Sequence, residues 1–148
     1  MSSYRRILYH LVFSTKYRRP TLSLESNREL YAYISGVIRN KNCFLYRING
    51  MEDHIHILCE VHPSISLGDF MREIKVSTSI WLKQNRNFPF FEGWAVGYGA
   101  FTYSYKDRGK IINYIKNQQE HHRGRSYEKE LLSLLEEQGV IPDMRYFP

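Results

Sequence analysis

The chain has 148 residues, 43% of them hydrophobic, and a formal net charge of +6. This length suits one domain over residues 1–148 with a core of its own, and the hydrophobic content excludes a disordered chain. No apolar run reaches the ~20 residues of a membrane span, and the N-terminal residues lack the apolar stretch and cleavage site of a signal peptide.

The first half of the chain alternates between strand and helix patterns. Residues 4–14 form a nearly continuous apolar run, which predicts a central strand. Residues 24–40 then place apolar side chains at helical spacing, which predicts an amphipathic helix. Two further strands are predicted over 43–48 and 54–61, and Asn49–Gly50 between them is typical of a hairpin turn.

The second half predicts one more strand and three helices. Apolar spacing indicates a helix over 66–84, and a Gly- and aromatic-rich segment over 94–105 predicts a bulged or bent strand. Two helices are then predicted over 107–122 and 128–138, on either side of Gly124. The order βαββαβ predicts an α+β, ferredoxin-like antiparallel sheet with helices packed on one face, followed by C-terminal helices.

Two histidines stand two residues apart in the third predicted strand. Because side chains alternate along a strand, His54 and His56 share one face, while Ile55 and Ile57 face a core. Two imidazoles side by side on a rigid strand suit a metal site. Such a pair is more often an ordinary surface or core feature, so a metal centre needs further ligands from elsewhere.

The third predicted helix carries polar side chains that could face the histidines. Tyr114, Gln118 and His121 stand at positions i, i+4 and i+7 and therefore share one face. That face adjoins the isoleucines that dock the helix, so these side chains are held close to the sheet. A polar helix flank with a tyrosine at its edge is the plainer interpretation.

These pieces, in this order, resemble the HUH-type single-tyrosine transposases of small insertion sequences and the related REP-associated tyrosine transposases. Residues 53–58 resemble the family's His-hydrophobic-His motif, and Tyr114-x-x-x-Gln118 resembles its catalytic helix. Residues 13–20 resemble its basic N-terminal signature, and residues 97–104 resemble the strand before the catalytic helix. The resemblance covers about residues 4–122 and leaves a C-terminal helix and tail, about 124–148, outside it.

The resemblance implies a metal-dependent transposase that nicks and rejoins single-stranded DNA at insertion-sequence ends. Tyr114 would attack the scissile phosphorus, giving a 5′-phosphotyrosine and a free 3′-hydroxyl. His54, His56 and Gln118 would hold one divalent cation, Mg²⁺ or Mn²⁺, that polarises the phosphate. Zinc competes for imidazoles, but an amide oxygen as third ligand favours a harder ion.

Other side chains near these motifs leave alternatives open. Asp53 is either an outer partner of a metal-binding histidine or a simple turn residue. His121 could replace or assist Gln118 as a ligand. Three further tyrosines near the fourth predicted strand are rival nucleophiles on sequence alone: Tyr98, Tyr103 and Tyr105.

The basic residues indicate where DNA would lie. The net positive charge suits a polyanion, and the twelve tyrosines suit single-stranded DNA, although most of them also fit half-buried sheet positions. The basic segment 15–20 is either a solvated loop or a lip that binds phosphates. The expected phosphate contacts are Lys16, Arg18, Arg19, Arg72 and Lys75. The resemblance implies hairpin-ended DNA as substrate and a homodimer that exchanges the tyrosine helix, with no membrane partner. The residues themselves leave open whether Tyr114 serves its own chain or the partner.

Other classes of function share parts of this pattern. A non-catalytic ferredoxin-like nucleic-acid-binding module accounts for the charge and the tyrosines, but not for the histidines together with Tyr114 and Gln118. An HUH nickase or replication initiator would share the chemistry, as would a domesticated REP-processing protein; the short chain argues against the initiator. Cys43 and Cys59 lie in apolar runs, which predicts buried free thiols and a cytoplasmic protein.

Overall fold

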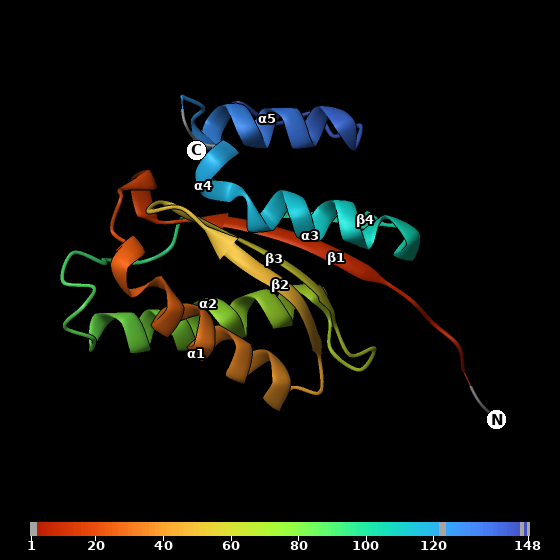
Figure 1. Cartoon of the computed structure of the whole chain (residues 1–148), viewed down its shortest axis with the longest axis horizontal. Coiled ribbons are helices and arrows are strands. Elements are labelled where there is room, and N and C mark those ends of the chain that lie inside the picture. Colours follow the sequence, from red (N-terminus) through yellow and green to blue (C-terminus); the bar gives the residue numbers. More distant parts are fainter. Residues whose placement is uncertain (1–2, 122–123, 146, 148) are drawn as a thin grey trace.

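The computed structural model describes residues 3–121, 124–145 and 147, and for His121 the backbone alone. Four antiparallel strands form one sheet: β1 (Leu8–Ser14), β2 (Phe44–Gly50), β3 (His54–Glu60) and β4 (Gly99–Tyr103). Their spatial order is β2-β3-β1-β4, so β3 lies inside the sheet (Figure 1). The predicted ferredoxin-like α+β fold is confirmed, with the histidine strand in a central position.

Helices cover both faces of this sheet, as Figure 1 shows. The two helices of the βαββαβ unit, α1 (Asn27–Asn40) and α2 (Leu67–Lys83), pack together on one face, as predicted. The C-terminal helices α3 (Arg108–Lys116), α4 (Gln118–His121) and α5 (Tyr127–Glu137) lie on the opposite face. In the described part of the chain, no helix combines the length and the apolar character that crossing a membrane requires.

The larger core lies between the sheet and the helices α1 and α2. Alternate residues of the two central strands, such as Leu11 and Ile57, point into it and are fully buried. Because successive strand residues face opposite sides, the intervening residues must be covered by the C-terminal helices. Smaller apolar clusters on that second face join the sheet to α3 and α5 through Val12, Leu58, Ile115 and Leu131.

Two strand boundaries differ from the sequence prediction. β1 begins at Leu8 rather than at residue 4, because Leu8 already pairs with Tyr103, the last residue of β4. The predicted strand over 94–105 is reduced to Gly99–Tyr103, since Gly97 adopts a positive φ of 88° that interrupts the extended chain. Trp94 forms an isolated bridge with Thr15 instead.

The hairpin that carries the histidines turns later than expected. Asn49 and Gly50 are the last residues of β2 and pair with His56 and Ile55, so the predicted Asn49–Gly50 turn is wrong. The connection is made by residues 51–53, and the Met51 N–H donates to the His54 carbonyl oxygen at 3.0 Å. The Asn49 side chain can therefore hydrogen-bond to the end of α3, which packs over β2.

The predicted helix over 107–122 is broken in the structure. α3 ends at Lys116, Asn117 is non-helical, and α4 restarts at Gln118. Asn49 Nδ2 donates to the carbonyl oxygens of Ile115 and Lys116, at 3.0 Å each, and so satisfies helix-end acceptors that a continuous helix would have used internally. The last predicted residue of this helix, His122, lies outside the described residues. The break directs Gln118 toward the histidines.

Candidate active site

The site is built around His54 and His56, which share one face of β3 as their spacing predicts. Both side chains are fully buried beneath the C-terminal helices, while Ile55 and Ile57 lie in the core on the other face. The two imidazole centroids are 5.1 Å apart. Because β3 is hydrogen-bonded on both sides, the pair stands on a rigid support.

His54 has one ring nitrogen fixed and the other directed into the site. Its Nδ1 donates to Asp53 Oδ1 at 2.7 Å, while Nε2 lies 3.2 Å from Gln118 Oε1. Burial lowers the pKa of His54, but hydrogen bonds and charges from Asp53 and Glu130 outweigh burial and raise it to about 9. Asp53 therefore stands where an outer partner orients a metal-binding imidazole.

His56 has an equivalent outer partner that the sequence did not indicate. His10 on β1 places Nε2 2.7 Å from His56 Nδ1, and the two rings stack at 5.0 Å. Burial, followed by repulsion from His56, lowers the pKa of His10 to about 3, so its ring is neutral. In the described part of the chain His10 Nδ1 has no hydrogen-bond partner. His10 Nε2 therefore orients His56, whose own Nε2 points into the site.

Glu130 on α5 is a site residue that the sequence analysis did not predict. Its carboxylate is fully buried, and Oε1 lies 2.9 Å from His56 Nε2 and 3.2 Å from His54 Nε2. The other oxygen, Oε2, accepts a hydrogen bond from Gln118 Nε2 at 3.0 Å and another from the Tyr114 hydroxyl. Both predicted groups, the histidine pair and the tyrosine helix, thus converge on one carboxylate.

A sequence signal for Glu130 existed but was missed. The buried residues of α5 are Tyr127, Glu130, Leu131 and Leu134, which follow the i, i+3, i+4, i+7 spacing of a helix face. A carboxylate inside an otherwise apolar stripe is expensive unless it is paired or ligates a metal. Its position in the stripe was therefore evidence for a functional role.

Tyr114 reaches the site from α3 of the same chain. Its ring centroid lies 5.8 Å from that of His56, and its hydroxyl donates to Glu130 Oε2. Burial, then the negative charge and hydrogen bond of Glu130, raise the pKa of Tyr114, so the phenol is protonated at neutral pH. Among the rival tyrosines, Tyr98 and Tyr105 are exposed, and Tyr103 lies beside His10 with ring centroids 6.1 Å apart.

The sequence matches a model of one protein family over most of its length. The family model described as "Transposase IS200 like" matches residues 3–118. The chain belongs to the IS200-like transposase family. It is therefore a DNA transposase, an enzyme that cleaves DNA, and Tyr114, Gln118 and both histidines fall inside the matched residues, whereas Glu130 lies beyond them.

Individual relatives of this IS200-like transposase agree with the family match. The transposases for insertion sequence element IS200 of Salmonella typhimurium and Salmonella typhi are each 33% identical over 120 residues, covering 76% of either chain. A crystal structure from Deinococcus radiodurans, assigned as a transposase, is 27% identical with a TM-score of 0.58, over 80% of this chain and 95% of that one. A REP-associated tyrosine transposase bound to a REP hairpin shares the fold, with 19% identity and a TM-score of 0.61 over 83% and 75% of the chains.

The basic residues of this transposase fall into two groups, one in the segment after β1 and the other on α2. Arg18 lies beside the site, where it pairs with Glu128 of α5 at 3.0 Å, and the neighbouring Arg19 pairs with Glu92 at 2.7 Å. Lys16 is exposed in the same segment. The other two expected DNA contacts are on α2, across the sheet from the histidines: Arg72 pairs with Asp69 at 2.7 Å, and Lys75 Nζ donates to the Ala95 and Gly97 carbonyls.

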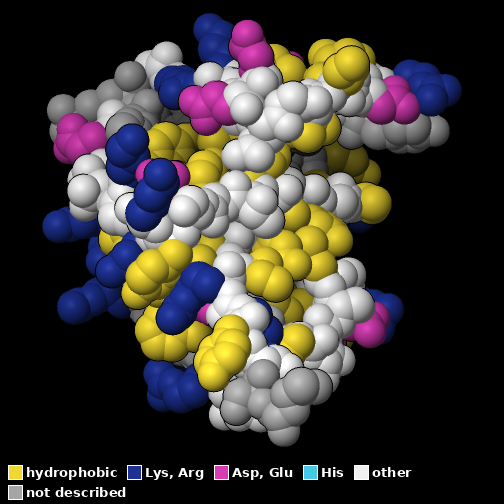
Figure 2. Space-filling model, turned by 90° about the vertical axis from the view of Figure 1, so that its right-hand side faces the viewer, with side chains coloured by type: hydrophobic (Ala, Val, Ile, Leu, Met, Phe, Trp, Pro, Cys, Tyr) yellow, Lys and Arg dark blue, Asp and Glu magenta, His cyan; other side chains and the backbone are white. Residues whose placement is uncertain are grey.

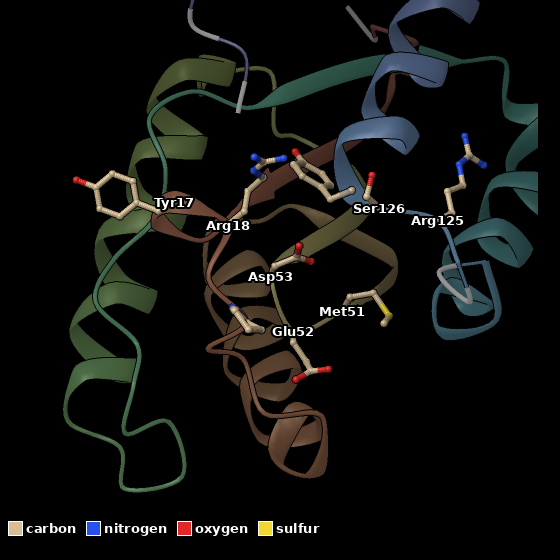
Figure 3. Close-up of a pocket in the computed structure, with 9 residues that line it drawn as sticks. Tyr17, Arg18, Met51, Glu52, Asp53, Arg125 and Ser126 are labelled. Carbon is tan, nitrogen blue, oxygen red and sulfur yellow. The ribbon is translucent and has the colours of Figure 1, made fainter.

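Two cavities open on either side of the buried transposase site. The first, of about 420 Å³, is drawn in Figure 3; Arg18, Asp53 and Ser126 stand around it, with Arg125 at its edge. The second, of about 270 Å³, is lined by Tyr114 and His10 together with the cations Lys110 and Arg125. The second cavity gives a route to Tyr114, and its two cations suit the approach of a phosphate.

The donor set of this transposase fits a divalent cation. Single ligand atoms of His54, His56 and Glu130 all lie within 4.8 Å of one another, and all three side chains are buried. Gln118 Oε1 lies beside the same imidazole nitrogen as Glu130 Oε1. Imidazole nitrogens with carboxylate and amide oxygens form a mixed set that accepts Mn²⁺ or Mg²⁺, and both imidazoles have the outer partners that metal sites require. The predicted ligand His121 has no described side chain.

Proposed function

We propose that the chain nicks and rejoins single-stranded DNA through a 5′-phosphotyrosine on Tyr114, with a divalent cation held by His54, His56 and Gln118. The observation that carries this proposal is the convergence on Glu130. The Tyr114 hydroxyl and the Nε2 atoms of both histidines contact the same buried carboxylate. A nucleophile and a ligand pair so close together can act on one phosphate group.

The cation would supply charge stabilisation at the scissile phosphate and so favour attack on phosphorus. The chain's residues orient the ligands: Asp53 holds His54 and His10 holds His56, each through Nδ1. These bonds leave both Nε2 atoms directed into the site. The fixed ring orientation reduces the reorganisation needed when DNA binds.

Tyr114 forms the new bond. Its phenolic oxygen attacks phosphorus, the bond from phosphorus to the 3′-oxygen breaks, and the 3′-oxygen takes a proton from water and leaves as a hydroxyl. Glu130 Oε2 already accepts the phenolic hydrogen and is positioned to receive it as the bond forms. The resulting phosphotyrosine keeps the phosphodiester bond energy, so attack by another 3′-hydroxyl can reverse the step and join new ends.

Single-stranded DNA with hairpin ends is the substrate that we infer. A protein with the same fold, a REP-associated tyrosine transposase, has been solved bound to a REP hairpin. On the face of this chain shown in Figure 2, Lys and Arg side chains gather on the left-hand half with hydrophobic side chains between them. Near the start of α3, the Tyr105 ring lies under the guanidinium groups of Arg6 and Arg108, at 4.4 and 3.8 Å. Cations beside exposed rings suit phosphates with unpaired bases.

The test is incubation of the chain with a hairpin oligonucleotide that carries a single-stranded flank, in the presence of Mn²⁺ or Mg²⁺. Wild type is expected to form a covalent protein–DNA adduct that survives denaturation, and Tyr114→Phe is expected to bind the DNA without forming it. Tyr103→Phe is the matched control and is expected to retain the adduct. Binding by wild type without any adduct would instead support a non-catalytic module.

Subunit arrangement is tested by mixing two inactive variants, Tyr114→Phe and His56→Ala. We propose a homodimer, and the mixture shows which subunit's tyrosine serves each site. A mixture that stays inactive would show that each site is complete within one chain, as the contact between Tyr114 and Glu130 of the same chain allows. Restored adduct formation would show that one subunit's tyrosine serves the other subunit's histidines.

A further inference from the structure

We propose that Glu130 is a ligand of the cation, which makes α5 part of the metal centre. This inference rests on the proposed metal-dependent function and extends it to a helix beyond the family match, which ends at residue 118. Its geometric basis is the position of a single atom. Oε1 of Glu130 lies 2.9 Å from His56 Nε2 and 3.2 Å from His54 Nε2, so all three atoms face one point.

The two oxygens of the carboxylate have different partners, which allows two simultaneous roles. Oε1 faces the imidazole nitrogens, while Oε2 accepts hydrogen bonds from Tyr114 and Gln118. A cation bound by Oε1 therefore leaves the bond between Oε2 and the nucleophile intact. Glu130 would fix the distance between the cation and Tyr114, which both must contact the same phosphate.

Charge and burial favour a ligand role for this carboxylate. The set His54, His56 and Gln118 is uncharged when it binds a metal, because imidazoles ligate in their neutral form. Glu130 adds one negative charge and a hard oxygen atom, which raises the affinity for Mn²⁺ and Mg²⁺. A fully buried carboxylate also gains most from a cation at contact distance, because water cannot screen their attraction.

The packing of α5 positions Glu130 Oε1 at the histidines. Ser126 caps the helix by accepting from the Lys129 N–H at 3.2 Å, and the Tyr127 ring stacks on His54 with centroids 4.5 Å apart. Leu131 and Leu134 anchor the next turn against Val12 of β1. The helix that carries Glu130 is therefore fixed by contacts that do not depend on a metal.

The experiment measures Mn²⁺ binding directly, by the electron paramagnetic resonance signal of free Mn²⁺ during titration of the full chain. Glu130→Gln keeps the size of the side chain and one acceptor oxygen but removes its charge. We expect its Kd for Mn²⁺ to rise at least about tenfold, the size of effect seen when the surroundings of a metal site are altered. Glu128→Gln is the matched control on the same helix, and its Kd is expected to stay within twofold of wild type.

Two further variants keep the result decisive. Glu130→Asp retains the charge on a shorter side chain and is expected to bind Mn²⁺ more tightly than Glu130→Gln. In both variants the visible absorption of bound Co²⁺ is expected to differ from that of wild type. Glu130→Gln with wild-type affinity and an unchanged Co²⁺ spectrum would overturn the ligand role. His54→Ala is the separate check on the proposed function: wild-type Mn²⁺ affinity in this variant would overturn the metal site itself, whatever the Glu130 variants do.

Discussion

Gly50, at the end of β2, has no room for a side chain. A Cβ atom built there would lie 2.2 Å from the His54 carbonyl oxygen and 3.0 Å from Ile55 Cα. Both are backbone atoms, and the His54 carbonyl is held by the Met51 N–H at 3.0 Å. A Gly50→Ala substitution must therefore push apart the two strands of the hairpin at the residue that begins the histidine motif.

The expected magnitude follows from this geometry. Forcing extra atoms into a well-packed position costs about 1–3 kcal/mol. Gly36 provides a matched control, because it lies inside α1 and a Cβ there would meet nothing within 4 Å. Gly36→Ala is expected to stabilise the chain by about 0.5–1 kcal/mol through the better helix propensity of alanine. The same chemical change thus has opposite signs at the two glycines.

Thermal unfolding of wild type and the two variants checks this prediction. For a domain of this size, each kcal/mol corresponds to roughly 2–4 °C in Tm. Gly50→Ala is expected to melt below wild type and Gly36→Ala above it. Gly50→Ala should also bind Mn²⁺ more weakly, because the displaced backbone belongs to a ligand. A Gly50→Ala protein that melts at or above the wild-type temperature would refute the close approach of the two strands.

Three other predictions address the surroundings of the site. Asp53→Asn removes the charge that orients His54 and is expected to weaken Mn²⁺ binding about 10–100-fold in calorimetric titrations without unfolding the chain. Ser126→Ala removes the cap of α5 and is expected to lower the free energy of unfolding, measured with denaturant, by about 1 kcal/mol and to weaken Mn²⁺ binding. Ser66→Ala removes the cap of α2 and should lower the free energy of unfolding without changing Mn²⁺ binding. In single-stranded DNA binding, Arg18→Ala should reduce the slope of log K against log salt by about 0.7, and Arg72→Ala, across the sheet, should leave it unchanged.

Periodicity predicted the fold because each strand and helix is buried on defined faces. The alternation at residues 54–57 placed two histidines and two isoleucines on opposite faces, and the structure agrees. The hairpin turn was misplaced because Asn49–Gly50 is locally typical of a turn, yet Asn49 is instead held in β2 by its bonds to the end of α3. That contact joins residues far apart in sequence, so no local pattern could reveal it.

The candidate site shows the same division between local and long-range information. Tyr114 and Gln118 were singled out because their spacing on one helix resembles the catalytic helix of single-tyrosine transposases, although the helix proved to be broken between them. His10 was not found, because its relation to His56 arises from pairing between β1 and β3 rather than from spacing. Glu130 arrives from a helix whose position over the sheet no sequence pattern fixes.

Peptide mapping of the protein–DNA adduct tests whether Tyr114 becomes covalently attached to DNA. Wild-type protein would be incubated with hairpin DNA and Mn²⁺, digested with nuclease and protease, and analysed by mass spectrometry. We expect a nucleotide phosphate on the peptide that contains Tyr114. Attachment to a peptide that contains Tyr103 or Tyr127, the other tyrosines packed against the site histidines, would contradict it.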